Sequence, residues 1–139
     1  MRGCAPHTVA AMTVARQTLG RHAEGLVARR LQRAGWLIVA RNVRTSDVRG
    51  EIDVVAVDGD ALVFVEVKAR REGSMLGPEA PAMAVGARKR AKLRSLAVAW
   101  LRDRGYDVPR HRHLRFDVVG LRLDAAGRVT EYEHVRAAF

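Results

Sequence analysis

The segment GEIDVVAVDGDALVFVEVKAR, residues 50–70, decides the fold of this chain. It contains two runs rich in valine, residues 51–57 and 61–69, on either side of an Asp-Gly-Asp stretch. Valine and phenylalanine favour strands, and an Asp-Gly pair favours a tight turn. The segment therefore predicts a β-hairpin at the centre of a sheet.

Three charged residues interrupt these apolar runs: Asp53 in the first strand, and Glu66 and Lys68 in the second. Glu66 and Lys68 are two positions apart, so a strand places them on the same face. Buried charges are costly unless they are paired or bound to a metal. One interpretation is a buried salt bridge that serves only the structure. The other is an acidic site for a hard divalent cation, which an excess of carboxylates around a single lysine favours.

The register of the hairpin decides whether Asp53 joins this site. A two-residue Asp58-Gly59 turn, which the dipeptide favours, places Asp53 opposite Phe64 with Glu66 one diagonal step away. A four-residue loop over 58–61 places Asp53 directly opposite Glu66. A three-residue loop places Asp53 on the wrong face.

Hydrophobic spacing and turn residues give the remaining elements. We expect a helix over 19–35, strands over 36–43, 115–123 and 128–135, a loop over 70–81 and a long helix over 82–104. With the hairpin, the order is α-β-β-β-α-β-β, an α/β fold with a central mixed sheet flanked by helices. We assign residues 19–139 to a single domain and residues 1–18 to a disordered N-terminal extension.

Composition points to a polyanionic partner. The chain of 139 residues carries 25 Lys and Arg against 15 Asp and Glu, a net charge of +10. Nucleic acid is the first candidate for such a partner. The single cysteine, Cys4, excludes a disulfide framework and Cys-based zinc sites, and it fits a cytoplasmic location. No run of residues is long and apolar enough to span a membrane, so we expect no membrane partner.

The acidic hairpin resembles the PD-(D/E)xK nuclease superfamily, which has the restriction-endonuclease-like three-layer fold. A longer series of motifs is similar to the YraN family of small bacterial proteins and covers residues 19–139. That series is Gly20-x-x-x-Glu24, Gly50-Glu51-Ile52-Asp53, Phe64-Val65-Glu66-Val67-Lys68, Arg115-Phe116-Asp117-Val118 and the terminal Ala138-Phe139. Ile52 departs from the superfamily pattern, which has proline there, but that proline carries no chemistry.

The resemblance implies a role for each matching residue. Asp53 and Glu66, with the backbone carbonyl of Val67, would bind Mg²⁺ or Mn²⁺, and Lys68 would orient the attacking water and stabilise charge. Glu24 matches a first-helix glutamate that completes the metal site in some resolvase-like relatives. Helical spacing puts Glu24 at the edge of the apolar stripe, where it is either a ligand or a solvated acid. Glu51 is either a supporting acid or exposed.

The helix over 82–104 carries a second clue, because Lys89 falls inside its apolar stripe. Lys89 either extends past the sheet edge to solvent or enters the cleft to bind phosphate. We expect the basic residues around the cleft to contact nucleic-acid phosphates, namely Arg44, Arg49, Arg70, Lys89 and Lys92. Asp117 is interpreted as a structural acid.

The sequence therefore predicts a metal-dependent nuclease acting on nucleic acid, with DNA, including branched or processed DNA, as the expected substrate. Small domains of this class often act as homodimers, and the resemblance extends that expectation here. The alternative is a non-catalytic nucleic-acid-binding or adaptor protein that keeps the nuclease fold.

Overall fold

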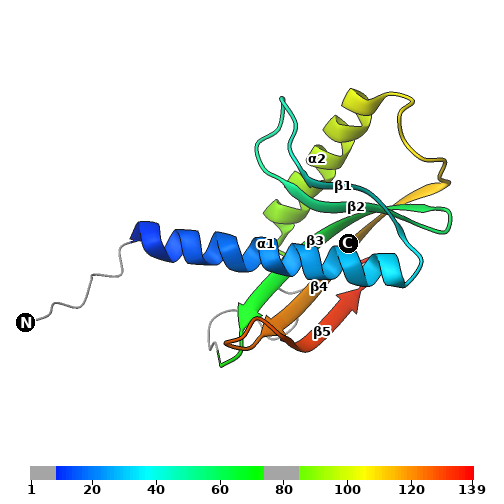
Figure 1. The fold of residues 1–139 in the computed structure, drawn as a ribbon. Helices are drawn as coiled ribbons and strands as arrows, with labels where there is room; N and C mark the ends of the chain where they lie inside the picture. Colours follow the sequence, from blue (N-terminus) through cyan, green and yellow to red (C-terminus); the bar gives the residue numbers. More distant parts are fainter. Residues whose placement is uncertain (1–8, 74–84) are drawn as a thin grey trace, which may run out of the picture.

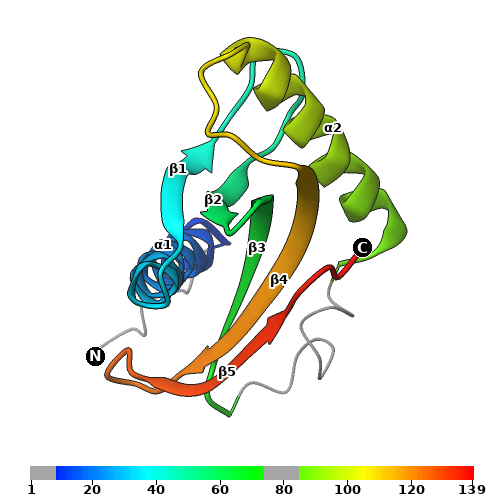
Figure 2. The ribbon, with the colours of Figure 1, turned by 90° about the vertical axis from the view of Figure 1, so that its right-hand side faces the viewer.

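The computed structural model describes residues 9–73 and 85–139, which form a five-stranded sheet with a helix against each face (Figures 1 and 2). Along the chain the elements are α1 (Val9–Arg33), β1 (Leu37–Val43), β2 (Ile52–Asp58), β3 (Ala61–Arg71), α2 (Ala87–Arg104), β4 (His113–Leu123) and β5 (Val129–Val135). The three layers of helix, sheet and helix confirm the predicted α/β fold and its element order.

The strands lie in the sheet in their sequence order, β1 to β5. All neighbouring pairs are antiparallel except β3 and β4, which are parallel. Parallel neighbours require a long crossover, and α2 supplies it. The sheet is therefore mixed, as predicted, and its one parallel pair lies next to the central hairpin.

Each face of the sheet has its own apolar core. Alternate residues of β2 and β3 face opposite sides, which is why both runs are valine-rich. On the α1 side the buried residues include Ala23, Val27, Leu31, Val54, Val63 and Val65. On the α2 side they include Val55, Leu62, Phe64, Leu93, Leu96 and Trp100.

The hairpin register differs from the one that Asp-Gly favours. Asp58 pairs with Ala61 and Val54 pairs with Val65, so Gly59 and Asp60 form the turn. Asp58 stays in the strand because its carboxylate accepts a 2.9 Å hydrogen bond from Arg115 of β4. This is the register of the four-residue alternative, and continued by one position it sets Asp53 opposite Glu66.

Strands β2 and β3 separate beyond this pairing. Their ladder ends at Val54 and Val65, whereas β3 continues to pair with β4 as far as Arg71 and Leu123. The backbone of β3 therefore has an open edge from Glu66 onward. The acidic residues of the hairpin lie at this fork.

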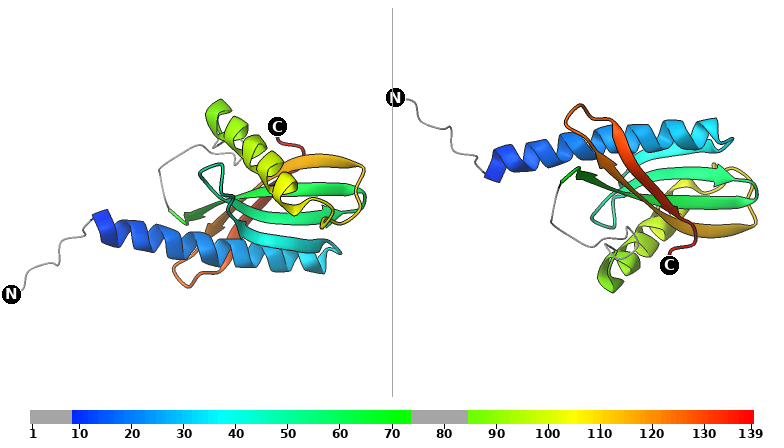
Figure 3. Two further views of the ribbon diagram at one scale, coloured as in Figure 1. Left: turned by 90° about the horizontal axis from the view of Figure 1, so that it is seen from above. Right: turned by 90° about the horizontal axis from the view of Figure 1, so that it is seen from below.

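Several predicted boundaries are wrong. Helix α1 begins at Val9 rather than at residue 19, because the alanine-rich segment before Leu19 continues the helix without burial. Residues 9–18 therefore belong to α1 and not to a disordered extension; residues 1–8 lie outside the described residues. In Figure 3 this part of α1 runs beyond the body of the sheet.

Helix α2 begins at Ala87, with Gly86 at its N-cap, and not at residue 82. Val85 is buried in the core ahead of the helix, and residues 82–84 lie outside the described residues. Strand β3 extends through Arg71, so the predicted loop loses its first two residues to the strand. Residues 74–81 of that loop also lie outside the described part of the chain.

The far end of the sheet is held by Asp117 of β4, whose side chain is 0% exposed. It accepts hydrogen bonds from Arg115 at 2.9 and 3.0 Å and from the backbone N–H of Ala137, and Nε2 of His134 lies 2.8 Å away. Burial acts to raise the pKa of Asp117, but these hydrogen bonds outweigh it and hold the pKa below its usual value. The interpretation of Asp117 as a structural acid agrees with these contacts.

Replacing Asp117 with alanine is expected to destabilise the fold by about 3–5 kcal/mol, because Arg115 and His134 lose a buried partner. Urea unfolding measures this change in the free energy of unfolding. The matched control is Glu131→Ala, which removes an exposed partner of Arg122 and should cost less than about 1 kcal/mol. Equal effects of the two substitutions would contradict the assignment.

Candidate metal and nucleic-acid site

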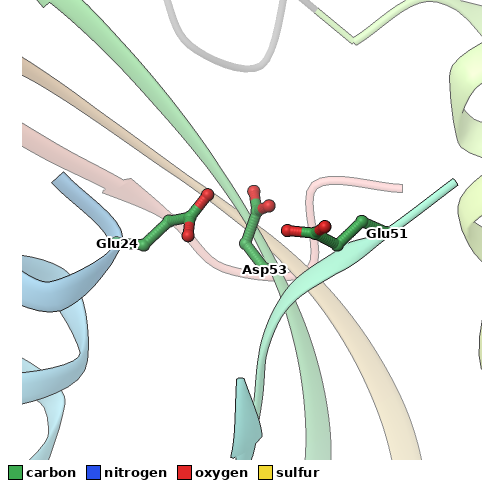
Figure 4. A group of neighbouring side chains, drawn as sticks. All are labelled: Glu24, Glu51 and Asp53. Atoms are coloured by element: carbon green, nitrogen blue, oxygen red, sulfur yellow. The ribbon is translucent and has the colours of Figure 1, made fainter. Parts of the chain in front are cut away.

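Three carboxylates from separate segments meet at the fork between β2 and β3 (Figure 4). Glu24 comes from α1, Glu51 lies just before β2, and Asp53 lies within β2. One oxygen of each lies within 4.8 Å of the other two. We call these three residues the carboxylate cluster, and its oxygen ligands are of the type that hard divalent cations prefer.

The backbone of the fork positions Asp53. Its Oδ2 accepts a 2.7 Å hydrogen bond from the backbone N–H of Val67, one of the groups left without a β2 partner. In an extended strand the N–H and C=O of one residue point to the same edge. The Val67 carbonyl therefore faces the same opening as the Asp53 carboxylate.

Glu51 is brought to the cluster by the connection between β1 and β2. Gly50 has a φ of +119°, which only glycine adopts easily. A Cβ at Gly50 would also lie 3.2 Å from side-chain atoms of both Leu96 and Lys92. Glycine therefore lets the chain pass close to α2 and deliver Glu51, settling the choice that the sequence left open for this residue.

The electrostatics of the cluster disfavour full ionisation. Burial, followed by repulsion from Glu66, raises the pKa of Asp53 to about 8, although the Val67 N–H acts against this. Burial and then repulsion from Glu51 raise the pKa of Glu24. Asp53 has no ion pair with a cationic side chain within residues 9–73 and 85–139. Protons or a bound cation must therefore supply the positive charge that these acids need.

Glu66 is held differently. Its side chain is 6% exposed, and Oε1 lies 3.2 Å from Nζ of Lys68 and 3.6 Å from Nζ of Lys89. Its other oxygen, Oε2, is buried and has no hydrogen-bond partner among the described residues. The structural salt bridge is therefore present, but it leaves one buried acceptor open. A buried acceptor without a partner is costly, and a cation ligand would satisfy it.

Asn42 is a member of the site that sequence reasoning missed. It has a φ of +50°, and with its amide turned to donate, its nitrogen lies 2.9 Å from Glu51 Oε1 and 2.5 Å from Glu24 Oε2. An amide between two carboxylates reduces their repulsion and fixes their orientation. The available signal was an asparagine, tolerant of positive φ, at the end of a strongly strand-forming run.

The predicted phosphate-binding residues lie in different settings. Arg44 pairs with Glu51 at 3.0 Å. Lys89 reaches Glu66, so it enters the site rather than only extending to solvent. Arg49 is exposed, and Lys92 is an exposed residue of α2 that lies beside Gly50. Arg70 is half-buried and lines a groove along the end of β3.

Fold and site together define a three-layer α/β domain with a buried carboxylate cluster and two lysines at a strand fork. None of the helices in the described residues is long and apolar enough to cross a membrane. The model of the uncharacterised protein family UPF0102 matches residues 23–121. The chain belongs to this family, which confirms the resemblance to the YraN family.

Relatives in this family cover nearly the whole chain. A UPF0102 protein of Rhodococcus jostii is 49% identical over 121 residues, 87% of this chain and 95% of that protein. A UPF0102 protein of Streptomyces griseus is 47% identical over 119 residues, 85% of this chain and 94% of that protein. A third, of Nocardia farcinica, is 42% identical over 132 residues, 95% of this chain and 97% of that protein.

The raised pKa of Asp53 predicts that stability falls as pH rises. Between its ordinary pKa of 3.8 and about 8, the folded protein keeps a proton that the unfolded chain releases. Without divalent cations, the free energy of unfolding should therefore decrease from about pH 4 to pH 8, by at most about 1.4 kcal/mol per pH unit. Urea unfolding across this range measures it. Asp53→Asn should flatten the profile, and an equally steep profile in that variant would contradict the assignment.

Proposed function

We propose that this protein is a Mg²⁺- or Mn²⁺-dependent nuclease that hydrolyses phosphodiester bonds in nucleic acid, with DNA as the expected substrate. One observation carries the proposal: buried carboxylates from three segments converge without a compensating cationic partner for Asp53, beside a lysine-held Glu66 that has an open oxygen. A purely structural ion pair needs neither the acidic excess nor the open acceptor.

The residues fit a hard divalent cation. The unpartnered Glu66 Oε2 and the cluster oxygens supply ligands of the right chemistry. In this proposal Asp53, Glu66, Glu24 and the Val67 carbonyl bind the cation, as the resemblance implies, and Glu51 supports them. When bound, the cation neutralises the carboxylates and lowers the pKa of a coordinated water.

The side chains of this protein then do the remaining work. The water oxygen bonds to phosphorus, the bond between phosphorus and the leaving sugar oxygen breaks, and the water's proton passes to solvent or to a nearby base. Lys68 is 34% exposed and lies at the edge of the site, where its ammonium orients the water and stabilises the negative charge that develops on phosphate oxygens. Lys89 adds a second positive charge on the opposite wall, from α2.

A non-catalytic nucleic-acid-binding protein is the second candidate, favoured by the pairing of Glu66 with Lys68 and of Asp53 with the Val67 N–H. In that case the charged residues maintain the fork. Substitutions would then reduce stability without affecting any cleavage. Cleavage and folding must therefore be measured on the same variants.

The deciding experiment incubates labelled single-stranded, duplex and four-way-branched DNA with Mn²⁺, Mg²⁺ or EDTA. We expect cleavage by the wild type only with a divalent cation, and a loss on the order of 100-fold or more in Asp53→Asn and in Lys68→Ala. Asp60→Ala, at the exposed hairpin turn, is the matched control and should cleave like the wild type. Circular dichroism verifies that each variant is folded.

Calorimetric titration with Mn²⁺ gives a readout independent of cleavage. The wild type and Asp60→Ala should bind Mn²⁺, and Asp53→Asn should bind it at least about tenfold more weakly. DNA binding without cleavage under every metal, equal in all variants, would retire the nuclease and favour the binding protein.

A further inference from the structure

A groove of about 730 Å³ runs beside the carboxylate cluster, between α1 and the end of β3. Residues 15–20 of α1 form one wall and residues 67–73 of β3 and its following turn form the other (Figures 1 and 3). Val67 and Lys68 belong both to this groove and to the candidate site. The groove therefore opens onto the cluster.

Gly20 forms part of the α1 wall and has no packing role there. Glycine is the least favourable residue in a helix interior after proline, so its presence in α1 calls for a reason. A Cβ at Gly20 would meet nothing within 4 Å, so no neighbouring atom requires a glycine. The other common reason is the close approach of a ligand to the backbone.

The position of Gly20 on the helix places this approach next to the site. Arg16, Gly20 and Glu24 are spaced four residues apart, which puts them one above the other on one face of α1. Along that face a cation is followed by an open surface and then by a carboxylate of the cluster. A molecule lying over Gly20 would reach Glu24.

The lining of the groove has two kinds of side chain. Leu19, Val67 and Ala69 are partly buried apolar residues. The cationic residues of the lining outnumber its acids and are Arg16, Lys68, Arg70 and Arg71, against the single acid Glu72. An apolar floor beneath positive charge complements a nucleic-acid strand, which presents bases and phosphates together.

We propose that this groove binds an unpaired nucleic-acid strand and leads it over Gly20 to the carboxylate cluster. The inference rests on the proposed nuclease function and narrows its substrate to single strands or the unpaired portions of branched molecules. The groove volume lies in the range of pockets that enclose a drug-sized molecule, about 300–1,000 Å³, so it accepts a short piece of one strand and not a duplex. None of the described residues lining it is aromatic, so base preference is weak and salt dependence strong.

The test fills the groove without removing charge. Gly20→Ala and Gly20→Leu place a small and a large side chain over the open surface, and both residues favour helix more than glycine does. Gln17→Leu is the matched control: it adds the same side chain to an exposed position of α1 that does not line the groove. Fluorescence anisotropy with a labelled single-stranded oligonucleotide in EDTA measures strand binding without cleavage.

We expect Gly20→Leu to weaken single-strand binding by about tenfold or more, with a smaller loss in Gly20→Ala and none in Gln17→Leu. Arg16→Ala combined with Arg71→Ala should reduce the salt dependence of single-strand binding by about 0.7 log units per lost phosphate contact. Arg33→Ala with Arg128→Ala, two exposed arginines outside the groove, should not.

Unchanged single-strand affinity in a folded Gly20→Leu variant would overturn the groove proposal, and so would equal losses in Gln17→Leu. A labelled duplex of the same sequence that binds as tightly as the single strand and loses equally in Gly20→Leu would also overturn it. The nuclease proposal fails separately, through absent Mn²⁺ binding or cleavage while Gly20→Leu still loses strand binding.

Discussion

The hydrogen bond from the Val67 N–H to the Asp53 carboxylate is the interaction on which the site depends. It forms where the β2–β3 ladder ends and replaces the backbone partner that β3 loses there. A buried N–H without an acceptor would be costly, so the fork can exist only with a side-chain acceptor at this position. The same carboxylate is thereby fixed at the opening, beside Glu66 and the Val67 carbonyl.

The site concentrates unfavourable electrostatics that the rest of the fold tolerates. Burial and mutual repulsion raise the pKa values of Asp53 and Glu24, while Asn42 separates Glu24 from Glu51 and two lysines hold one oxygen of Glu66. By contrast, Asp117 at the other end of the sheet is fully hydrogen-bonded and has a lowered pKa. One buried acid stabilises the fold, and the others are positioned for a cation.

The terminal residues show how the remaining sequence motifs serve the architecture. The backbone N–H of Ala138 donates to Phe116 of β4 at 2.8 Å, and the ring of Phe139 stacks on that of Phe116 with 5.2 Å between centroids. The C-terminus therefore lies against the α2 side of the sheet (Figure 2). The Ala138-Phe139 motif is explained by packing, whereas Gly20, a motif residue without a packing role, is explained by the groove.

The sequence by itself determined the α/β class, the element order and the central acidic hairpin, because alternating burial and turn residues are local properties of the chain. It also singled out Asp53, Glu66 and Lys68 as charges that apolar strands do not accept without a reason. Only the tertiary structure decided the hairpin register, which depends on Arg115 binding Asp58 from another strand. It likewise decided the places of Glu51 and Asn42, because contacts between α1, the β1–β2 connection and β3 bring distant residues together.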